Sequence, residues 1–239
     1  MGTMDAKAVS ERFSPGLRPP TQERSKASLE RVLAAGAELL IERGYKGFTV
    51  ADVARRAHAT TGLIYARFAG KAALFEGVMI REMTRITEEE NSGLQKLREA
   101  DLPLGDRIEQ AVRFLAAVSR REARLTLVFT ERTWSESTLM EHVKRLRTAP
   151  RLLEQLLLDQ IQDFAHPEPE RAASMVFWMT NAAIEHRVHT NTWSYWDPSA
   201  SDDWDEFVGE LVCAMKAYIM APTPVPQTLG IRGVSKIPM

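Results

Sequence analysis

Cysteine is nearly absent from this sequence, and so are the long apolar runs of membrane-spanning or exported chains. The 239 residues include one cysteine, Cys213, so no disulfide can form within the chain. This favours a reducing compartment, and the apolar helical pattern around Cys213 predicts a buried thiol. The start of the chain lacks the apolar core of a signal peptide, and no stretch of about 18 apolar residues could span a membrane. We therefore expect a cytoplasmic protein that makes no membrane contact.

Sequence motifs of catalysis are missing as well. The chain has no glycine-rich phosphate loop, no nucleophile elbow and no paired metal motif. Glu185, His186 and His189 lie close together on one predicted helix, but zinc needs three or four ligands in a closed geometry, and nothing in the sequence fixes the remaining ones. We predict no catalytic residues, no metal and no cofactor.

Charge is unevenly distributed along the chain, although the net charge is only −1. Residues 1–80 hold 12 basic and 8 acidic side chains, whereas residues 81–239 hold 19 basic and 24 acidic ones. A basic N-terminal part on an acidic remainder is typical of a nucleic-acid-binding segment attached to a body that does not bind nucleic acid.

Helical spacing of apolar residues dominates the whole chain, and no alternating strand pattern competes with it. The sequence therefore predicts an all-α fold. Prolines predict flexible ends, an arm over residues 1–22 and a tail over residues 221–239. The predicted helices are Thr21–Arg43 (stopped by Gly44), Val50–Ala57, Thr61–Phe68, Lys71–Leu97, Leu104–Ser119, Glu122–Arg132, Glu136–Phe164 (kinked near Pro150), Glu170–His189 and Asp203–Met220.

The most informative segment is FTVADVARRAHATTGLIYARFAGK, residues 48–71. Its first helix has apolar residues at helical spacing, namely Val50, Val53, Ala54 and Ala57. A turn at His58 and Ala59 follows, and Thr60 stands where a helix N-cap belongs. The second helix buries Ile64 and Phe68 and leaves polar residues on its other face. Two short helices in this arrangement predict a helix-turn-helix.

The residues that flank this motif extend the pattern in both directions. VLAAGAELLIERGY precedes it, and TTGLIYARF is followed by Lys71. Over Arg31 to Phe75 the chain resembles the DNA-binding domain of the TetR family of bacterial transcriptional regulators. One position departs from the family pattern, because His58 stands where a glycine usually begins the turn. Histidine tolerates the left-handed region better than β-branched residues do, so we expect a slightly strained turn of the same kind.

The resemblance implies a three-helix DNA-binding domain that reads the major groove of a double-stranded operator. The residues at matching positions are Thr49, Thr60, Thr61, Gly62, Tyr65, Arg67 and Lys71. Thr49, Tyr65 and Lys71 are expected to contact phosphates, and Thr60 is expected to cap the recognition helix. Arg67 is expected to contact either a phosphate or a guanine, and Gly62 either contacts DNA or only permits its close approach.

The rest of the chain resembles the ligand-binding and dimerisation domain of the same family in length and helix layout only. Bulky aromatics and methionines on successive helices, with few charges among them, predict a mostly apolar small-molecule effector. The candidate ligand contacts are Phe129, Trp134, His142, Met175, Trp178, Met179 and Asn181. The last two helices are expected to form a homodimer, with Val176, Met179, Ala183, Phe207, Leu211 and Met215 in the interface.

These inferences combine into one functional hypothesis. We expect a DNA-binding domain over residues 23–70, a ligand-binding and dimerisation domain over residues 71–220, and a ligand-responsive dimeric transcriptional regulator, most often a repressor in this family. Two alternatives remain open at this point. One is an architectural DNA-binding protein without a ligand, and the other is a helical enzyme that carries a DNA-binding head.

Overall fold

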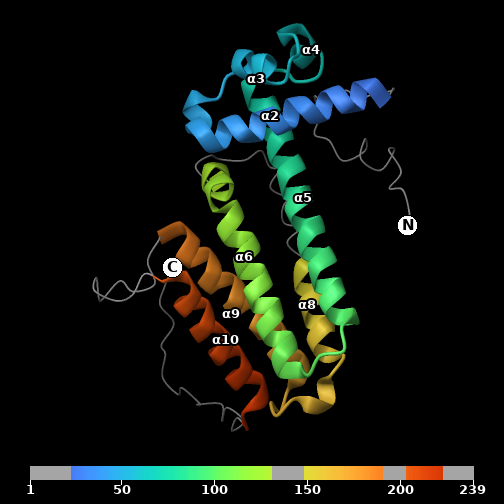
Figure 1. The fold of residues 1–239 in the computed structure, drawn as a ribbon, viewed down its shortest axis with the longest axis vertical. Coiled ribbons are helices and arrows are strands. Elements are labelled where there is room, and N and C mark those ends of the chain that lie inside the picture. The colour runs from blue at the N-terminus through green and yellow to red at the C-terminus, as the bar shows by residue number, and fades with distance from the viewer. Residues whose placement is uncertain (1–22, 131–147, 191–202, 223–239) are drawn as a thin grey trace, which may run out of the picture.

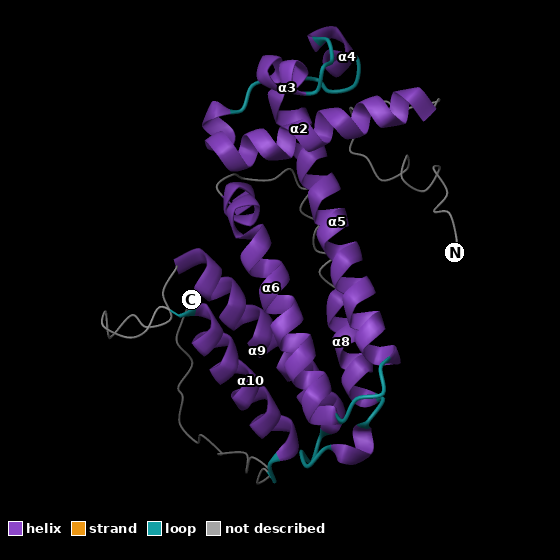
Figure 2. Cartoon of the chain, in the orientation of Figure 1, coloured by secondary structure: helices purple, strands orange, loops and turns teal. Residues whose placement is uncertain are grey.

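The computed structural model describes residues 23–130, 148–190 and 203–222, and every regular element in these ranges is helical (Figures 1 and 2). The predicted all-α fold is confirmed. The elements are α2 (Glu23–Gly47), α3 (Val50–Arg56), α4 (Thr61–Tyr65), α5 (Lys71–Glu99), α6 (Leu104–Thr130), α8 (Thr148–Leu158), the 3-10 turn η1 (Ile161–Asp163), α9 (Pro169–Thr190) and α10 (Trp204–Met220).

The head consists of α2, α3 and α4, which lie at one end of the molecule above the first turns of α5 (Figure 1). Gly44 interrupts α2 with φ 62 and ψ −179, so the regular helix stops at the glycine that the sequence predicted. Only glycine adopts this region at little cost, because it has no Cβ. The backbone thereby turns toward α3, and Phe48 enters the core fully buried.

One apolar cluster joins the head to the rest of the chain. It gathers residues from α2, α3, α4, the segments that follow α2 and α4, the start of α5 and the end of α6: Leu33, Leu40, Phe48, Val53, Ile64, Phe68, Phe75, Val78 and Phe129. Phe129 of α6 meets Phe75 of α5 edge-on, with ring centroids 6.0 Å apart. The end of α6 therefore forms part of the head core.

The body packs α5, α6, α8, α9 and α10 around a second apolar cluster (Figure 1). α6 is one continuous helix, so the predicted break between Ser119 and Glu122 is wrong. Glu122 is buried and paired within the structure, so this charged stretch packs as part of a helix. The predicted helix Glu136–Phe164 is described only from Thr148, and it ends at Leu158, before η1.

Two further sequence inferences meet the structure in the body. Cys213 lies exposed on α10, so the predicted buried thiol is wrong. The apolar pattern of α10 places Val212 and Met215 inward, and Cys213 falls on the opposite face. None of the described helices combines the length and the apolar character that crossing a membrane requires.

The contact between α5 and the turn after α4 leaves no room at Gly77. A Cβ added there would lie 2.6 Å from Cε1 of Phe68 and 3.5 Å from Cδ2 of Leu33. Overpacking of this kind costs about 1–3 kcal/mol, because the ring must leave its position. We predict that Gly77→Ala lowers the free energy of unfolding by this amount, as measured by urea denaturation.

Gly105→Ala provides the matched control, because a Cβ added at Gly105 has its nearest neighbour, Sδ of Met220, at an ordinary contact distance of 3.5 Å. A Gly77→Ala variant as stable as the Gly105→Ala variant would show that the packing at Phe68 is loose.

Candidate nucleic-acid interface

Two threonine caps set the helix-turn-helix. The hydroxyl of Thr49 accepts a hydrogen bond from the backbone N–H of Asp52 at 3.1 Å and donates to the Asp52 carboxylate at 2.7 Å. That second bond is the main reason why the pKa of Asp52 is below its ordinary value, and Arg55 and Arg43 lower it further. Thr60 accepts from the N–H of Leu63 at 3.2 Å, which confirms the predicted N-cap of α4.

The turn between α3 and α4 places His58 at φ 51, the one positive φ among the non-glycine residues of the described ranges. This agrees with the expected left-handed turn. The N–H of Ala59 donates to the carbonyl of Ala54 at 2.9 Å, and this bond closes the turn. A non-glycine residue in this region has a modest conformational cost. The flanking caps and the buried apolar residues offset this cost and hold the turn in place.

α4 presents an exposed face at the end of the molecule farthest from α8 and α10 (Figure 1). Ile64 is buried, whereas Thr61 and Gly62 are exposed and Tyr65 has 58% of its surface exposed. The Tyr65 hydroxyl makes no bond to the described residues of the chain, so it can donate to a phosphate. A Cβ added at Gly62 would have only Oγ1 of Thr60 nearby, at 4.0 Å. Packing within the described chain therefore does not require a glycine at this position.

Arg67 lies differently from the other predicted DNA contacts. Its guanidinium donates to the carbonyl oxygen of Ser25 at 3.1 Å and also bonds to the Ser25 hydroxyl. Arg67 is half-buried, and it ties the segment after α4 to the start of α2. In this conformation its donors stabilise the fold, because both of these bonds are made within the chain.

Lys71 begins α5 beside the same surface. Its ammonium lies 4.4 Å from the ring centroid of Tyr45 and 3.4 Å from the carbonyl oxygen of Lys46. The cation–π contact holds the charge near the surface without neutralising it. The side chain of Lys46 is exposed in the same region, and the sequence analysis missed it. The signal was available, since Lys46 is a basic residue just before the motif.

The predicted ligand contacts are dispersed by the structure. Trp134 and His142 lie outside the described residues. Phe129 packs in the head core, and Met175 and Trp178 lie on the outer face of α9, with 39% and 62% of their surfaces exposed. These three residues therefore do not line a common interior site, because burial in the core and the rotation of α9 separate them.

Met179 and Asn181 are the two predicted contacts that stay half-buried in the body. Met179 packs against the body core. Among the residues that the structure describes, no group of three or more His, Cys, Asp or Glu side chains could hold a metal ion.

Four of the six residues predicted for the interface on the last two helices are wrong. Val176, Phe207, Leu211 and Met215 are buried within the chain's own core, because they occupy the inward faces of α9 and α10. The outer faces are also apolar, and the sequence analysis missed most of them. We call this surface the outer α9–α10 face: Met175, Trp178, Ala182, Cys213, Ala214, Ala217 and Met220. Of the residues predicted for the interface, Met179 and Ala183 are half-buried at its edge.

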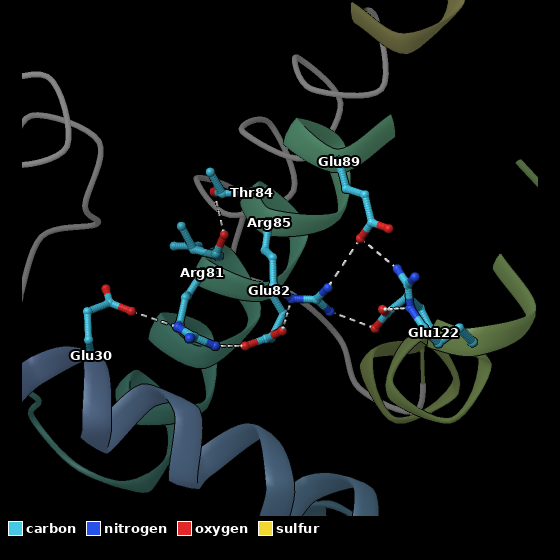
Figure 3. Close-up of polar contacts among 9 residues, drawn as sticks. Glu30, Arg81, Glu82, Thr84, Arg85, Glu89 and Glu122 are labelled. Atoms are coloured by element: carbon cyan, nitrogen blue, oxygen red, sulfur yellow. Dashed lines mark hydrogen bonds and ion pairs between the residues drawn. The ribbon is translucent and has the colours of Figure 1, made fainter. Parts of the chain in front are cut away.

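A charged cluster links the head to the body where the two apolar clusters meet (Figure 3). Arg81 of α5 bonds to Glu30 of α2 at 2.9 Å and also to Glu82. Arg85 reaches Oε2 of Glu82 at 2.8 Å and Oε2 of Glu122 on α6 at 2.7 Å. Three helices are thereby joined through charge-assisted hydrogen bonds.

Burial and pairing oppose each other in this cluster. Burial alone would raise the pKa of Glu122, but bonds from Arg85 and Arg121 outweigh it and hold the pKa below the ordinary value of 4.5. A carboxyl whose pKa is lower in the folded than in the unfolded protein stabilises the folded state fully at pH values above its unfolded pKa. This contribution is lost as the pH falls through the folded pKa. The Glu122 pairing is therefore intact at neutral pH and weakens only in acid.

Comparisons with known proteins agree on the head and on the fold. Residues 32–78 match the model of a family described as bacterial regulatory proteins, tetR family. No curated protein matches the chain. The resemblance found in the sequence is confirmed by the family match.

Solved structures share this fold over about four-fifths of the chain. The fatty acid degradation regulator FadR from Bacillus halodurans is 15% identical, with a TM-score of 0.56 over 79% of this chain and 94% of its own. FadR from Bacillus subtilis in complex with stearoyl-CoA is 14% identical, with a TM-score of 0.55 over 82% and 99%. A TetR/AcrR-family regulator from Thermobifida fusca is 18% identical, with a TM-score of 0.59 over 81% and 97%. At these identities the likeness shows the fold alone.

The charged cluster predicts a specific stability effect. Arg85→Ala removes one partner each from the buried carboxylates of Glu82 and Glu122. Loss of a partner by buried acceptors costs about 1–3 kcal/mol, with the lower end favoured because Arg85 is itself partly solvated. Urea unfolding should show this loss, whereas Arg98→Ala, which breaks a surface pair with Asp159, should change stability little. Equal losses of stability in both variants would show that the charged cluster contributes no more to stability than a surface ion pair does.

Proposed function

We propose that this TetR-family transcriptional regulator is a dimeric repressor that releases its operator when a mostly apolar small molecule binds in the helical body. The observation that carries the proposal is the exposed face of α4, in a segment that matches the family's DNA-binding model. Residues 23–70 would bind DNA and residues 71–220 would bind the effector and the second subunit. No catalytic role is assigned to any residue.

DNA binding would place α4 in the major groove, because an α-helix fits that groove and presents side chains to base edges. Thr61 and Gly62 at the start of α4 would face the bases. Tyr65 and Lys71 would bind phosphates on one side, and Thr49 would bind a phosphate at the start of α3. Lys46 adds an exposed cation close to Lys71.

Dimerisation would bury the outer α9–α10 face against its symmetry copy. Exposed apolar patches on soluble proteins mark interaction sites, and Trp178, Met175 and Met220 provide large side chains there. Small residues on α10, including Ala214 and Ala217, allow a second helix to approach closely. A two-fold axis would present two copies of α4 to half-sites about 34–36 Å apart.

The release of the operator on ligand binding would act through α5, which contributes to both the head core and the body core. The charged cluster joins α2, α5 and α6 beside the head core, so a displacement of α5 or α6 in the body must reach the head. The ligand shifts the population toward the conformation that releases DNA only if it binds that conformation more tightly than the DNA-binding one. The bound stearoyl-CoA of the B. subtilis structure supports an effector with a long apolar part.

The alternative of an architectural DNA-binding protein predicts no effector at all. Polar atoms without partners inside the body, such as Oγ1 of Thr180, favour a ligand-binding body. The experiment that tests the proposed function is selection of genomic DNA fragments by the purified full-length chain. Enrichment of a two-fold symmetric sequence would support a dimeric operator-binding regulator, and uniform recovery of all fragments would contradict it.

A first prediction concerns phosphate contacts. Lys71→Ala should weaken binding to all DNA sequences and reduce the slope of log affinity against log salt by about 0.9, because one released counterion is lost. Tyr65→Ala should also weaken binding without changing sequence preference. Gel-shift titrations at several salt concentrations measure both effects. Lys96→Ala removes the same charge from the exposed far part of α5 and should leave the slope unchanged.

A second prediction concerns assembly. Trp178→Asp places a charge in the centre of the outer α9–α10 face and should convert the dimer to a monomer in light scattering, because burying an unpaired charge is costly. Ile161→Asp is the matched control, since Ile161 is an exposed apolar residue on η1 with 41% of its surface exposed. A wild-type monomer at micromolar concentration would contradict the proposed interface.

A further inference from the structure

Glu90 of α5 lies on the side of the helix that faces the middle of the body. Two contacts fix the orientation of α5 there, because Gly93 lies against the ring of Phe114 on α6 and Arg98 bonds to Asp159 on α8 at 2.6 Å. With about 100° of rotation per residue, Glu90 falls between these two faces. The carboxylate therefore points between α6 and α8, toward the interior.

Glu90 has no hydrogen-bond or ion-pair partner within the described part of the chain, although it is half-buried. Burial, together with the smaller effect of the neighbouring Glu89 charge, raises its pKa to about 7. A carboxyl in such a place is unfavourable for stability unless a partner arrives, because burying an uncompensated charge costs free energy. Its presence on an otherwise apolar face is therefore unexplained by packing.

Charged groups on the surrounding helices are engaged elsewhere. On α6, Arg121 bonds to Glu122 at 2.9 Å. On α8, Glu154 accepts a hydrogen bond from Ser174 at 2.6 Å. On α9, Arg187 lies 6.0 Å from the ring centroid of Trp204. Neither Arg121 nor Arg187 pairs with Glu90 within the described residues, so these two cations leave its carboxylate without a counter-charge.

Other buried polar atoms in the described part of the body also lack a hydrogen-bond partner. Oγ1 of Thr180 on α9 and Oδ1 of Asn91 on α5 are buried without a hydrogen bond, and Thr180 is 1% exposed. Thr180 lies two turns before Arg187, and Arg187 and Arg120 of α6 both lie against Trp204. This register brings Thr180 to the level of Phe114 on α6, which is the residue that touches Gly93, one turn from Glu90.

We propose that the body binds an effector that joins an apolar skeleton to a protonated amine, with Glu90 as its anionic contact and the Thr180 hydroxyl as a second polar contact. The inference rests on the proposed function and deepens it by assigning a charge to the effector. The surrounding apolar residues Ile86, Leu94, Leu97 and Phe114 would contact the skeleton. An ammonium group compensates a buried carboxylate with strong hydrogen bonds, whereas a carboxylate or phosphate would repel it.

The experiment compares decylamine, decanol and decanoate, which share one apolar chain, by calorimetric titration of the full-length protein below their micellar concentrations. Decylamine should bind the wild type at least about tenfold more tightly than decanol, and decanoate should bind most weakly. Glu90→Gln should abolish the tenfold preference for the amine and leave the affinity for decanol unchanged. Glu88→Gln alters an exposed carboxylate on the same helix and should change nothing.

The pH profile separates a direct contact from a structural role. Protons compete with the amine for Glu90, so the dissociation constant for decylamine should rise as the pH falls from 8 to 6, by up to about tenfold per unit below the pKa. In Glu90→Gln the profile should be flat, and circular dichroism should show an unchanged helix content. A Glu90→Gln variant that keeps the amine preference or the pH profile overturns the inference, as does decylamine binding weaker than about 1 mM.

Gel shifts on the selected operator keep the two proposals distinguishable. Specific DNA binding together with no preference for the amine overturns only the assignment of Glu90. Amine binding at Glu90 in a protein that does not bind DNA specifically overturns the proposed function and leaves the site intact. Release of the operator by decylamine, lost in Glu90→Gln, supports both.

Discussion

The arrangement of the molecule depends on a layer of partly buried charge between two apolar cores. The head core ends along α5 at about Met79, and the body core begins at Leu94. Between them, Arg85 joins Glu82 of its own helix to Glu122 of α6. Apolar contacts tolerate small sliding movements, whereas charge-assisted hydrogen bonds require definite geometry. The layer therefore adds a directional constraint on the orientation of the head relative to the body.

The same constraint decides how the head can be used. Its caps and ion pairs are satisfied within the chain, including Arg56 with Glu42 at 2.5 Å and Arg67 with Ser25. What remains exposed on α4 is a short face with Thr61, Gly62 and Tyr65. A rigid and internally satisfied scaffold holds this face in place, so binding of DNA would need little reorganisation. Specificity then depends on few side chains, with phosphate contacts setting the register.

Helix rotation governs the body. α9 carries apolar residues on most of its circumference, so its sequence does not mark which face is inside. The structure buries Val176 and Thr180 and exposes Met175 and Trp178. The large apolar side chains that suggested a ligand wall therefore lie on the surface proposed for dimerisation. Conversely, Glu90 lies toward the interior, where a charged residue was not expected from composition.

The sequence by itself determined the helical fold, the helix-turn-helix with its Thr60 cap and His58 turn, and the interruption of the first helix at Gly44. These features depend on local rules, because caps, turns and helical periodicity involve residues within a few positions of one another. Only the tertiary structure decided that α6 runs unbroken past Ser119, that Phe129 belongs to the head core, and that Arg67 bonds to Ser25. Each of these depends on partners that are distant in the sequence, and periodicity carries no information about which distant helix will lie opposite a given face.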